Sequence, residues 1–479
     1  MVGRTARLLW YVVGSFIFVA AGLACSGGSG ATTVTLGAVT FHKDVEPILQ
    51  QHCDMCHVAS GIAPMPLVTY EDSQGYAALM AAQTSARSMP PWGAVSTSDC
   101  TPPLPWKDNP SLSDNQIAIL AAWSAAGAPE GNPADAPPPL TPQPIALSGV
   151  NGDLAPPAPW TLTSPSADEF RCFVLDPQIT QTTYLNGSFV VPGNPLVVHH
   201  ALVFTDPMGA SRALVTDQAT QSYDCFGGPN VSPTTLLAAW APGGLPTDYP
   251  SNVGAQLDPG TLLVMQVHYH PHVTTSLPPS DQTHFQMRLI STLPQYFAYT
   301  ILPGNFSAAV DSTGDGLLPG PDDPASGPAF DIPAGVSGHT ETMQFTVPAT
   351  VKKQPVPATL PIFSIGGHQH YVGSAVQVSV HHANPPAGAS ADQCLLAIPH
   401  WDFDWQRLYR YDAPIEQLPT VSPGDVMTIR CTYDNTLDNP KVAESLAEQG
   451  LTEPQDVHLG ETTLDEMCLG PMVLLAKLP

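Results

Sequence analysis

The chain has 479 residues, enough for about three domains at roughly 150 residues each. Only 12% of the residues are charged, and the formal net charge of −26 argues against electrostatic binding to nucleic acid or to an anionic membrane surface. With 43% hydrophobic residues and 54 prolines, the composition is that of a soluble globular protein.

Residues 1–25 have the pattern of a signal peptide. Two arginines precede an apolar run that ends at Cys25, and small residues follow this cysteine as in a bacterial lipoprotein cleavage site. We therefore expect an exported protein, either periplasmic or anchored to the outer membrane of a bacterium by a lipid on Cys25. An ordinary cleaved signal peptide is the alternative.

The motif HCDMCH at residues 52–57 is the attachment site of a c-type haem. The thiols of Cys53 and Cys56 would bond to the porphyrin vinyl groups, and His57 would coordinate the iron. A thioether on the opposite face suits an electron carrier, and we expect Met89 there, with Met65 as the alternative. The motif predicts one covalently bound haem c.

Residues 40–131 have a helical pattern around this motif and predict a small all-α, cytochrome c-like domain. One helix is expected to begin after Ser113, which has Gln116 three residues later as in a capping box. A proline-rich linker, 132–155, follows.

From about residue 156 the pattern changes to short β-type runs separated by turn residues. They include LVVHHALVFT, TLLVMQVHYH, FQMRLIST, SAVQVSV, DVMTIRCTY and PMVLLAKL, and PKVAESLAEQG is the exception that predicts a short helix. About 320 residues are too many for one sandwich. The fold prediction is therefore a multidomain chain, with the small α domain followed by two tandem all-β jelly-roll sandwiches over 156–295 and 296–479.

Six of the nine cysteines remain after the anchor and the haem motif are assigned. They are widely spaced, and in an exported protein we expect them to form disulfides. These cysteines are Cys100, Cys172, Cys225, Cys394, Cys431 and Cys468.

The sixteen histidines are unevenly distributed, and seven of them lie in three motifs of the β region. On a strand, residues i and i+2 share a face, so His368 and His370 would present two imidazoles side by side. The adjacent pair His199 and His200 can reach one ion only where the strand is bulged or strongly twisted. The third motif contains His268, His270 and His272.

These histidine motifs predict a metal site, because imidazole suits copper and zinc. A thioether selects Cu(I), and Met467 near the end of the chain is a candidate, although a methionine alone is more typical of core packing. One His-x-His pair by itself is a weak signal, whereas three clusters in one exported β protein are a stronger one.

Taken in order, the motifs HH at 199–200, QVHY at 266–269, HQH at 368–370 and DEMC at 465–468 resemble the copper type II, ascorbate-dependent monooxygenases. This family includes dopamine β-monooxygenase and peptidylglycine α-hydroxylating monooxygenase. The segment FRCFVLDP at 170–177 also resembles the family's first strand. The resemblance extends from about residue 156 to the C-terminus, and it depends on the order of the motifs.

The resemblance implies two copper ions, one in each jelly roll. The electron-transfer copper would be held by His199, His200 and His268, and the oxygen-binding copper by His368, His370 and Met467, which are then the catalytic residues. It also implies the disulfides Cys172–Cys225 and Cys431–Cys468. It leaves Cys100 and Cys394 unassigned, and it gives His270 and His272 no role as ligands.

The implied reaction is hydroxylation of a substrate C–H bond by O₂, with the second oxygen atom leaving as water. Two electrons and two protons must be supplied, and the fused haem would relay the electrons from an ascorbate-like reductant or a redox protein. The peptide-amidating members hold a substrate carboxylate with an arginine where this chain has Gly366. A peptide-glycine substrate is therefore not expected, and the small-molecule substrate is unidentified.

Two other functions remain open. The chain could be a non-catalytic copper and haem protein that transfers electrons or stores copper. It could also be a β-sandwich binding module whose histidines hold zinc or no metal. Oxygen consumption that depends on a substrate separates the first alternative from the monooxygenase, and metal analysis separates the second.

Overall fold

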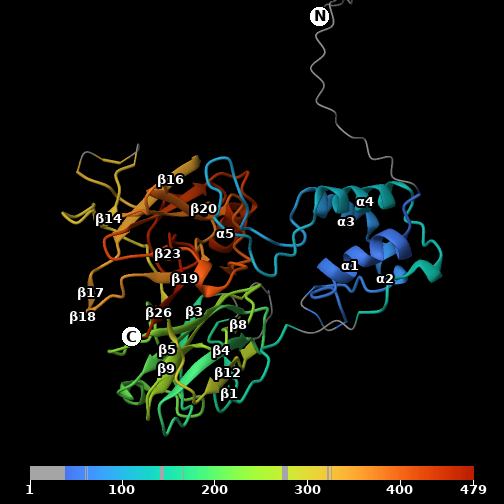
Figure 1. Ribbon diagram of the computed structural model, residues 1–479. Helices are drawn as coiled ribbons and strands as arrows, with labels where there is room; N and C mark the ends of the chain where they lie inside the picture. The colour runs from blue at the N-terminus through green and yellow to red at the C-terminus, as the bar shows by residue number, and fades with distance from the viewer. Residues whose placement is uncertain are drawn as a thin grey trace, which may run out of the picture. The chain divides into compact units, whose positions relative to one another are not determined.

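The computed structural model describes residues 38–478 except 60, 62, 141–144, 165–166, 272–278, 321–322 and 325. The expected signal peptide, Cys25 and His272 lie outside the described residues. The chain is mostly β-sheet with few helices (Figure 1), and Val39–Pro479 form one compact unit.

The helices of the N-terminal part follow one another between residues 41 and 125. Phe41, Leu49, Leu120 and Trp123 are almost completely buried and form their common core. The capping box expected at Ser113 is present, with Ser113 Oγ accepting from the Gln116 N–H at 3.3 Å and Gln116 Oε1 accepting from the Ser113 N–H at 2.9 Å. The helices are the π-helix η1 (Phe41–Val45), α1 (Glu46–His52), α2 (Tyr70–Gln74), α3 (Ala77–Ser85) and α4 (Asp114–Ala125).

Strands dominate the chain from residue 152 onward, where β1 begins within the predicted linker. A long sheet has the order β1 (Gly152–Leu154), β12 (His284–Ile290), β4 (Thr183–Val191), β9 (Val253–Leu257), β13 (Tyr296–Ile301), β26 (Met472–Lys477), β19 (Leu360–Gly366) and β22 (Leu408–Arg410). In addition, β8 (Thr247–Asp248) pairs with β4, and β23 (Thr420–Val421) pairs with β19.

Two further sheets have five strands each within the described residues. The first has the order β6 (Ser222–Asp224), β3 (Glu169–Leu175), β10 (Leu262–Tyr269), β5 (Val198–Asp206) and β7 (Leu236–Trp240). The second has the order β14 (Gly316–Leu317), β16 (Ser337–Thr346), β24 (Val426–Asp434), β20 (Gly373–His381) and β21 (Asp392–Ile398).

The remaining elements are short. Three two-stranded pairs are β2 (Trp160–Thr161) with β11 (Ser280–Asp281), β15 (Asp331–Ile332) with β25 (Val457–His458), and β17 (Thr350–Val351) with β18 (Gln354–Pro355). The helix expected in PKVAESLAEQG is α5 (Pro440–Gln449), and the 3₁₀ turns are η2 (Pro133–Asp135), η3 (Ala210–Leu214) and η4 (Ile415–Gln417).

Each five-stranded sheet packs on one half of the long sheet, which gives two β-sandwiches. The first core joins Phe173 and Met265 of one five-stranded sheet to Phe285 of β12. The second joins Val378 of β20 to Ile362 of β19. The two halves are continuous because β9 and β13 pair in parallel.

The three disulfides found among the described residues lie outside the haem motif. Cys172–Cys225 and Cys431–Cys468 confirm the pairs that the resemblance implied, and Cys100 pairs with Cys394. Disulfides indicate an oxidising, exported compartment. No helix in the described part of the chain is long and apolar enough to cross a membrane.

The segment between α3 and α4 lies on the second sandwich. Besides the Cys100–Cys394 bond, the Val95 N–H donates to the carbonyl of Ala397 at 3.0 Å, and the Lys107 N–H donates to the carbonyl of Arg410 at 2.8 Å. Trp106 stacks on Tyr411 with ring centroids 4.6 Å apart. This part of the predicted helical domain therefore contacts the edge strands β21 and β22.

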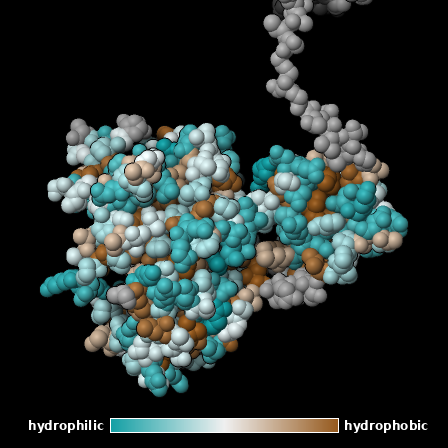
Figure 2. All heavy atoms as spheres, viewed as in Figure 1, coloured by the Kyte–Doolittle hydropathy of each residue, from teal (hydrophilic) through white to brown (hydrophobic). Residues whose placement is uncertain are grey.

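On the face shown in Figure 2, hydrophilic residues are interspersed with apolar ones over the β region. This mixture is ordinary for a globular surface, where isolated apolar residues are common. Polar residues gathered in the interior are less common, and this chain has such a group of histidines.

Candidate metal centre

His199, His200 and His268 converge on adjacent strands of the first sandwich. His268 of β10 lies opposite His200 of β5, but the next residue, Tyr269, lies opposite Val198, so His199 is the extra residue of a β-bulge. The Nδ1 atoms of His199 and His268 are 3.2 Å apart, as are those of His199 and His200. The bulge is the feature that lets two successive histidines reach one point.

Burial keeps these three imidazoles neutral. It lowers the pKa of each ring, and the neighbouring histidines lower the pKa of His199 and His200 further. One ligand atom from each ring lies within 4.8 Å of the others, and among the described residues Nε2 of His199 and Nε2 of His268 have no hydrogen-bond partner. Three neutral rings whose Nδ1 atoms converge fit a metal ion.

His268 is held in place by two contacts. Its ring stacks on Phe170 with centroids 4.1 Å apart, and its Nε2 lies 3.5 Å from Asp168 Oδ1, a distance longer than a well-formed hydrogen bond. Burial alone would raise the pKa of the Asp168 carboxyl, but His268 and His270 hold it well below its ordinary value. Asp168 is therefore an ionised carboxylate behind a candidate ligand, as in many metal sites.

His368 and His370 lie just beyond the end of β19 and not within a strand, which corrects the prediction made from their spacing. Their ring centroids are 5.1 Å apart and the ring planes are nearly perpendicular. Nδ1 of His368 lies 2.6 Å from Gln406 Oε1, and Nδ1 of His370 lies 3.1 Å from the carbonyl oxygen of Asp465. Because both contacts are with acceptors, each Nδ1 carries the proton and each Nε2 has a lone pair for a ligand.

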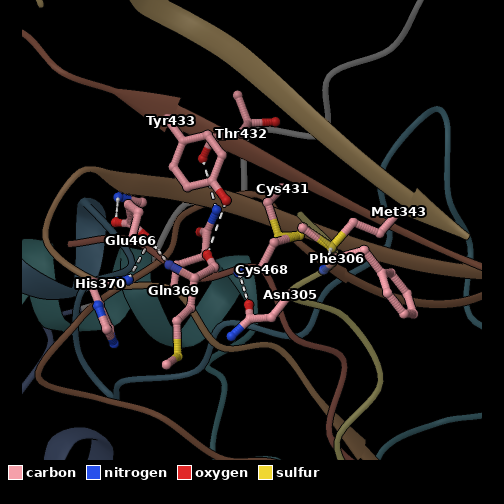
Figure 3. Close-up of a disulfide and its surroundings, with 12 residues drawn as sticks. Asn305, Phe306, Met343, Gln369, His370, Cys431, Thr432, Tyr433, Glu466 and Cys468 are labelled. Atoms are coloured by element: carbon pink, nitrogen blue, oxygen red, sulfur yellow. Dashed lines mark hydrogen bonds between the residues drawn. A yellow bond between two sulfur atoms is a disulfide. The ribbon is translucent and has the colours of Figure 1, made fainter. Parts of the chain in front are cut away.

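Glu466 organises the backbone that carries His370 and Met467, and Figure 3 shows Glu466 beside His370. Its Oε2 accepts from the N–H groups of both residues at 2.8 Å, and its Oε1 accepts from those of Val372 and Gly373 at 3.1 Å. Burial raises the pKa of Glu466 to about 8, and these N–H groups oppose that rise. The motif DEMC contained this residue, but nothing in its spacing indicated its role.

Met467 is fixed from the other side by β24. The phenol of Tyr433 donates to the carbonyl oxygen of Met467 at 3.0 Å, and the Cys431–Cys468 disulfide is next to it in the chain (Figure 3). The side chain of Met467 lines the same cavity as His200 and His368. The structure therefore brings the last predicted ligand to the region of the histidines.

The two histidine groups are adjacent. The rings of His200 and His368 have centroids 6.3 Å apart, and His370 is one of the residues that lower the pKa of His199 and His200. The five imidazoles thus form one cluster across the two sandwiches, whereas the resemblance implied a separate triplet in each.

A buried hydrogen-bond network beside this cluster joins the two sandwiches. His270 Nδ1 lies 2.5 Å from Asp168 Oδ1, and His270 Nε2 lies 2.7 Å from the hydroxyl of Tyr371. On its other oxygen, Asp168 accepts from the hydroxyl of Thr463 at 2.8 Å. Both ring nitrogens of His270 are engaged, which agrees with the expectation that His270 is not a ligand.

A cavity of about 830 Å³ opens beside the histidines. His200, His368 and Met467 line it together with apolar side chains such as Phe170, Leu202 and Trp240. Its volume is within the range of small-molecule sites, and its lining is mostly apolar with a few polar groups, as such sites usually are.

The cysteines of the haem motif are unpaired. Cys53 and Cys56 are the free cysteines of the described residues, and burial raises the pKa of Cys53 to about 12. Nδ1 of His57 lies 3.0 Å from the carbonyl oxygen of Met65, which leaves Nε2 of His57 free to coordinate iron. Met89 is 43% exposed, and its role as the opposite ligand stays a prediction.

The chain matches no protein-family model and no curated protein. Among solved structures it is similar to the major capsid protein P2 of bacteriophage PM2, with 8% identity and a TM-score of 0.21 over 65% of this chain and 98% of that one. It is also similar to the top component of cowpea mosaic virus, with 7% identity and a TM-score of 0.25 over 68% and 89%. TM-scores this low establish no shared fold, so the chemistry of the site has to be interpreted from its own residues.

Proposed function

We propose that this protein is a copper-dependent monooxygenase that hydroxylates a C–H bond of a small molecule, with electrons supplied through a fused c-type haem. The observation that carries the proposal is the convergence of His199, His200 and His268 within 4.8 Å beside His368 and His370. Five neutral imidazoles in a largely apolar interior are costly unless cations satisfy their lone pairs.

The donor sets match the family that the motifs resemble. His199, His200 and His268 would hold one copper, and His368, His370 and Met467 would hold a second, softer site. Copper at two such sites supplies one-electron storage and activation of O₂. The two tandem jelly rolls of that family are the finer fold assignment that we propose for the two sandwiches.

The chain's own residues orient these ligands. Gln406 and the Asp465 carbonyl fix the tautomers of His368 and His370, and Asp168 lies behind His268. The cavity beside His368 would hold the substrate and exclude bulk water from it.

The helical part of the chain would form a cytochrome c-like domain. Cys53 and Cys56 would attach the porphyrin, and His57 would ligate the iron through Nε2. Because the Met65 carbonyl contacts His57, Met65 lies on the His57 side, which favours Met89 as the opposite ligand. We also propose that Cys25 is the lipid anchor of a periplasmic or outer-membrane protein.

The test uses the full exported chain, purified with copper and haem. Metal analysis should give about two copper and one iron per chain, and zinc alone would refute the proposal. After anaerobic reduction and mixing with O₂, haem absorbance should report reoxidation of the haem together with the coppers. A His268→Ala variant should slow this haem reoxidation, whereas His284→Ala, which changes an exposed histidine bonded to Asp153, should not.

Catalysis is tested by O₂ consumption. A monooxygenase must consume O₂ in proportion to hydroxylated product when candidate small molecules and a reductant are supplied. A carrier would show reducible copper and haem, but its O₂ consumption would not depend on any added substrate.

A further inference from the structure

Arg407 is a buried cation without a partner. Arg407 is 8% exposed, and its Nε and Nη1 have no hydrogen-bond acceptor among the described residues. Arg171, which is buried to a similar degree, instead donates to Ser222 at 2.9 Å and pairs with Asp224. Arginines in protein interiors are normally paired, so the free donors of Arg407 indicate a missing anion.

The surroundings of Arg407 stabilise a cation but do not neutralise it. Its guanidinium lies 5.0 Å from the ring centroid of Trp405 and 5.8 Å from that of Trp92. The groups that act on it electrostatically are Cys56 of the haem motif and the phenol of Tyr409, whose pKa is raised by burial.

Asp108, Asp248 and Glu461 are the carboxylates among the described residues that line the cavity. Asp108 and Asp248 act on Arg410, which also donates to the carbonyl oxygen of Asp248 at 3.1 Å, and Asp248 pairs with Arg288 as well. None of the three is among the groups that act electrostatically on Arg407, so within the described residues its guanidinium has no carboxylate partner.

Arg407 is next to the candidate catalytic site. It lines the cavity with His368 and Met467, and it follows Gln406, which bonds to His368. Its backbone approaches β19 closely, because a Cβ on Gly366 would lie 2.6 Å from the carbonyl oxygen of Arg407. Glycine at position 366 thus makes room for the segment that carries Arg407.

We propose that Arg407 binds the carboxylate of an organic anion whose apolar body occupies the cavity beside His368. The planar guanidinium matches a carboxylate in shape and charge. The apolar lining, which includes Phe170, Leu202 and Trp240, accommodates an aliphatic or aromatic body. The role of this anion as the substrate rests on the proposed function. The binding of the anion to Arg407 does not depend on that function.

The test is calorimetric binding to the full-length, metal-loaded protein in its oxidised state without reductant, so that no turnover occurs. The probes are acetate, hexanoate, 3-phenylpropanoate and indole-3-acetate, together with the neutral amide of each. The larger carboxylates should bind, and their amides should bind about 10- to 100-fold more weakly, because a charge-assisted hydrogen bond is lost.

Variants assign the binding to Arg407. Arg407→Gln should weaken carboxylate binding by a similar factor of about 10 to 100, and Arg407→Lys, which keeps the charge but not the planar fork, should retain part of it. Arg212→Gln is the control, because Arg212 is an exposed arginine paired with Asp176 and does not line the cavity. Copper and iron contents of each variant show that it is folded and loaded.

Three results would overturn the inference. They are the absence of binding by all four carboxylates, equal affinities for carboxylates and amides, or an unchanged affinity in Arg407→Gln. If none of the four carboxylates binds and Arg407→Gln also shifts the haem potential, a haem propionate is the anion bound to Arg407. Carboxylate binding without substrate-dependent O₂ consumption would refute the proposed function and leave this inference standing.

Discussion

The imidazoles of His199, His200 and His268 depend on one another. Each is kept neutral by burial, so none can satisfy its lone pair by protonation near neutral pH. Contacts of 3.2 Å between Nδ1 atoms bring lone pairs and N–H groups together in a way that three rings alone cannot satisfy completely. A bound cation removes this conflict.

Removal of His268 should therefore remove the metal from this group. We expect His268→Ala to contain one copper fewer per chain. Loss of a hydrogen-bond partner of a ligand weakens metal affinity by roughly 10- to 100-fold, and loss of the ligand itself should weaken the copper affinity of this site by more. Copper analysis and paramagnetic resonance of the oxidised protein measure the effect. His284→Ala is the matched control, and equal copper contents in the two variants would contradict the assignment.

Acid should destabilise the metal-free chain. Burial lowers the pKa of His368 from 6.5 to about 4, so between these values the unfolded chain binds a proton that the folded chain does not. The contribution of this residue to the free energy of unfolding should thus fall by on the order of 3 kcal/mol as the pH decreases from about 6.5 to 4. Urea unfolding at several pH values measures the slope, and His368→Gln should reduce it. Glu466, whose pKa burial raises to about 8, acts in the opposite direction, so the test is the difference between the two proteins. An unchanged slope in His368→Gln would show that His368 is not buried as described.

At the scale of elements, strand ends and a disulfide position the second group. His368 and His370 follow β19, and the Cys431–Cys468 bond ties β24 to the segment that carries Met467. A methionine on a free C-terminal segment would be a poor ligand, because its ordering would cost conformational entropy at each binding event.

Removal of this disulfide should affect the methionine site selectively. We expect Cys431→Ala/Cys468→Ala to lose about 2 to 5 kcal/mol of stability and the copper–sulfur signal in X-ray absorption of the reduced protein. The control is Cys172→Ala/Cys225→Ala, which opens a loop of similar length in the first sandwich. The control should lose comparable stability but keep the copper–sulfur signal. Loss of the signal in both variants would mean that Cys431–Cys468 has no specific role.

Secondary structure was predictable at this scale because it depends on local patterns. The short β-type runs TLLVMQVHYH and DVMTIRCTY, with turn residues between such runs, predicted strands that the structure has as β10 and β24, and the Ser113 cap predicted the start of α4. His368 and His370 were predicted on a strand, but the Gly366–Gly367 pair precedes them and β19 ends at Gly366. Glycines disfavour continuation of a strand, and this signal was present in the sequence.

At the scale of the whole molecule, Asp168 links the two sandwiches. It is bonded to His270 of the first and to Thr463 of the second, and His270 extends the network to Tyr371. Tyr371 is next to His370 in the chain, and His270 is two residues after His268. Because the network joins Tyr371 to His270, it sets the distance between the two histidine groups.

A double-mutant cycle tests this link. Asp168→Asn should lower the free energy of unfolding by about 2 to 4 kcal/mol, because a half-buried ionised acceptor is lost. Thr463→Val should lower it less, and the two changes should couple by about 1 to 2 kcal/mol. Asp392→Asn, at an exposed carboxylate bonded to His381, should have almost no effect. Additive effects of the first two changes would show that the contact between the sandwiches is not made.

The local features of this protein could be established from its amino-acid order: the haem motif, the strand pattern, the candidate ligands and the need for a bulge at His199. Each motif consists of residues close together in the chain, and the assignment of the ligands came from the order of the motifs. Other features became visible only in the folded chain: the two histidine groups are neighbours, Asp168 and Glu466 hold them, Cys100 pairs with Cys394, and Arg407 lies unpaired in their cavity. Such contacts depend on strand register and sheet packing between residues far apart in the chain, which local spacing does not encode.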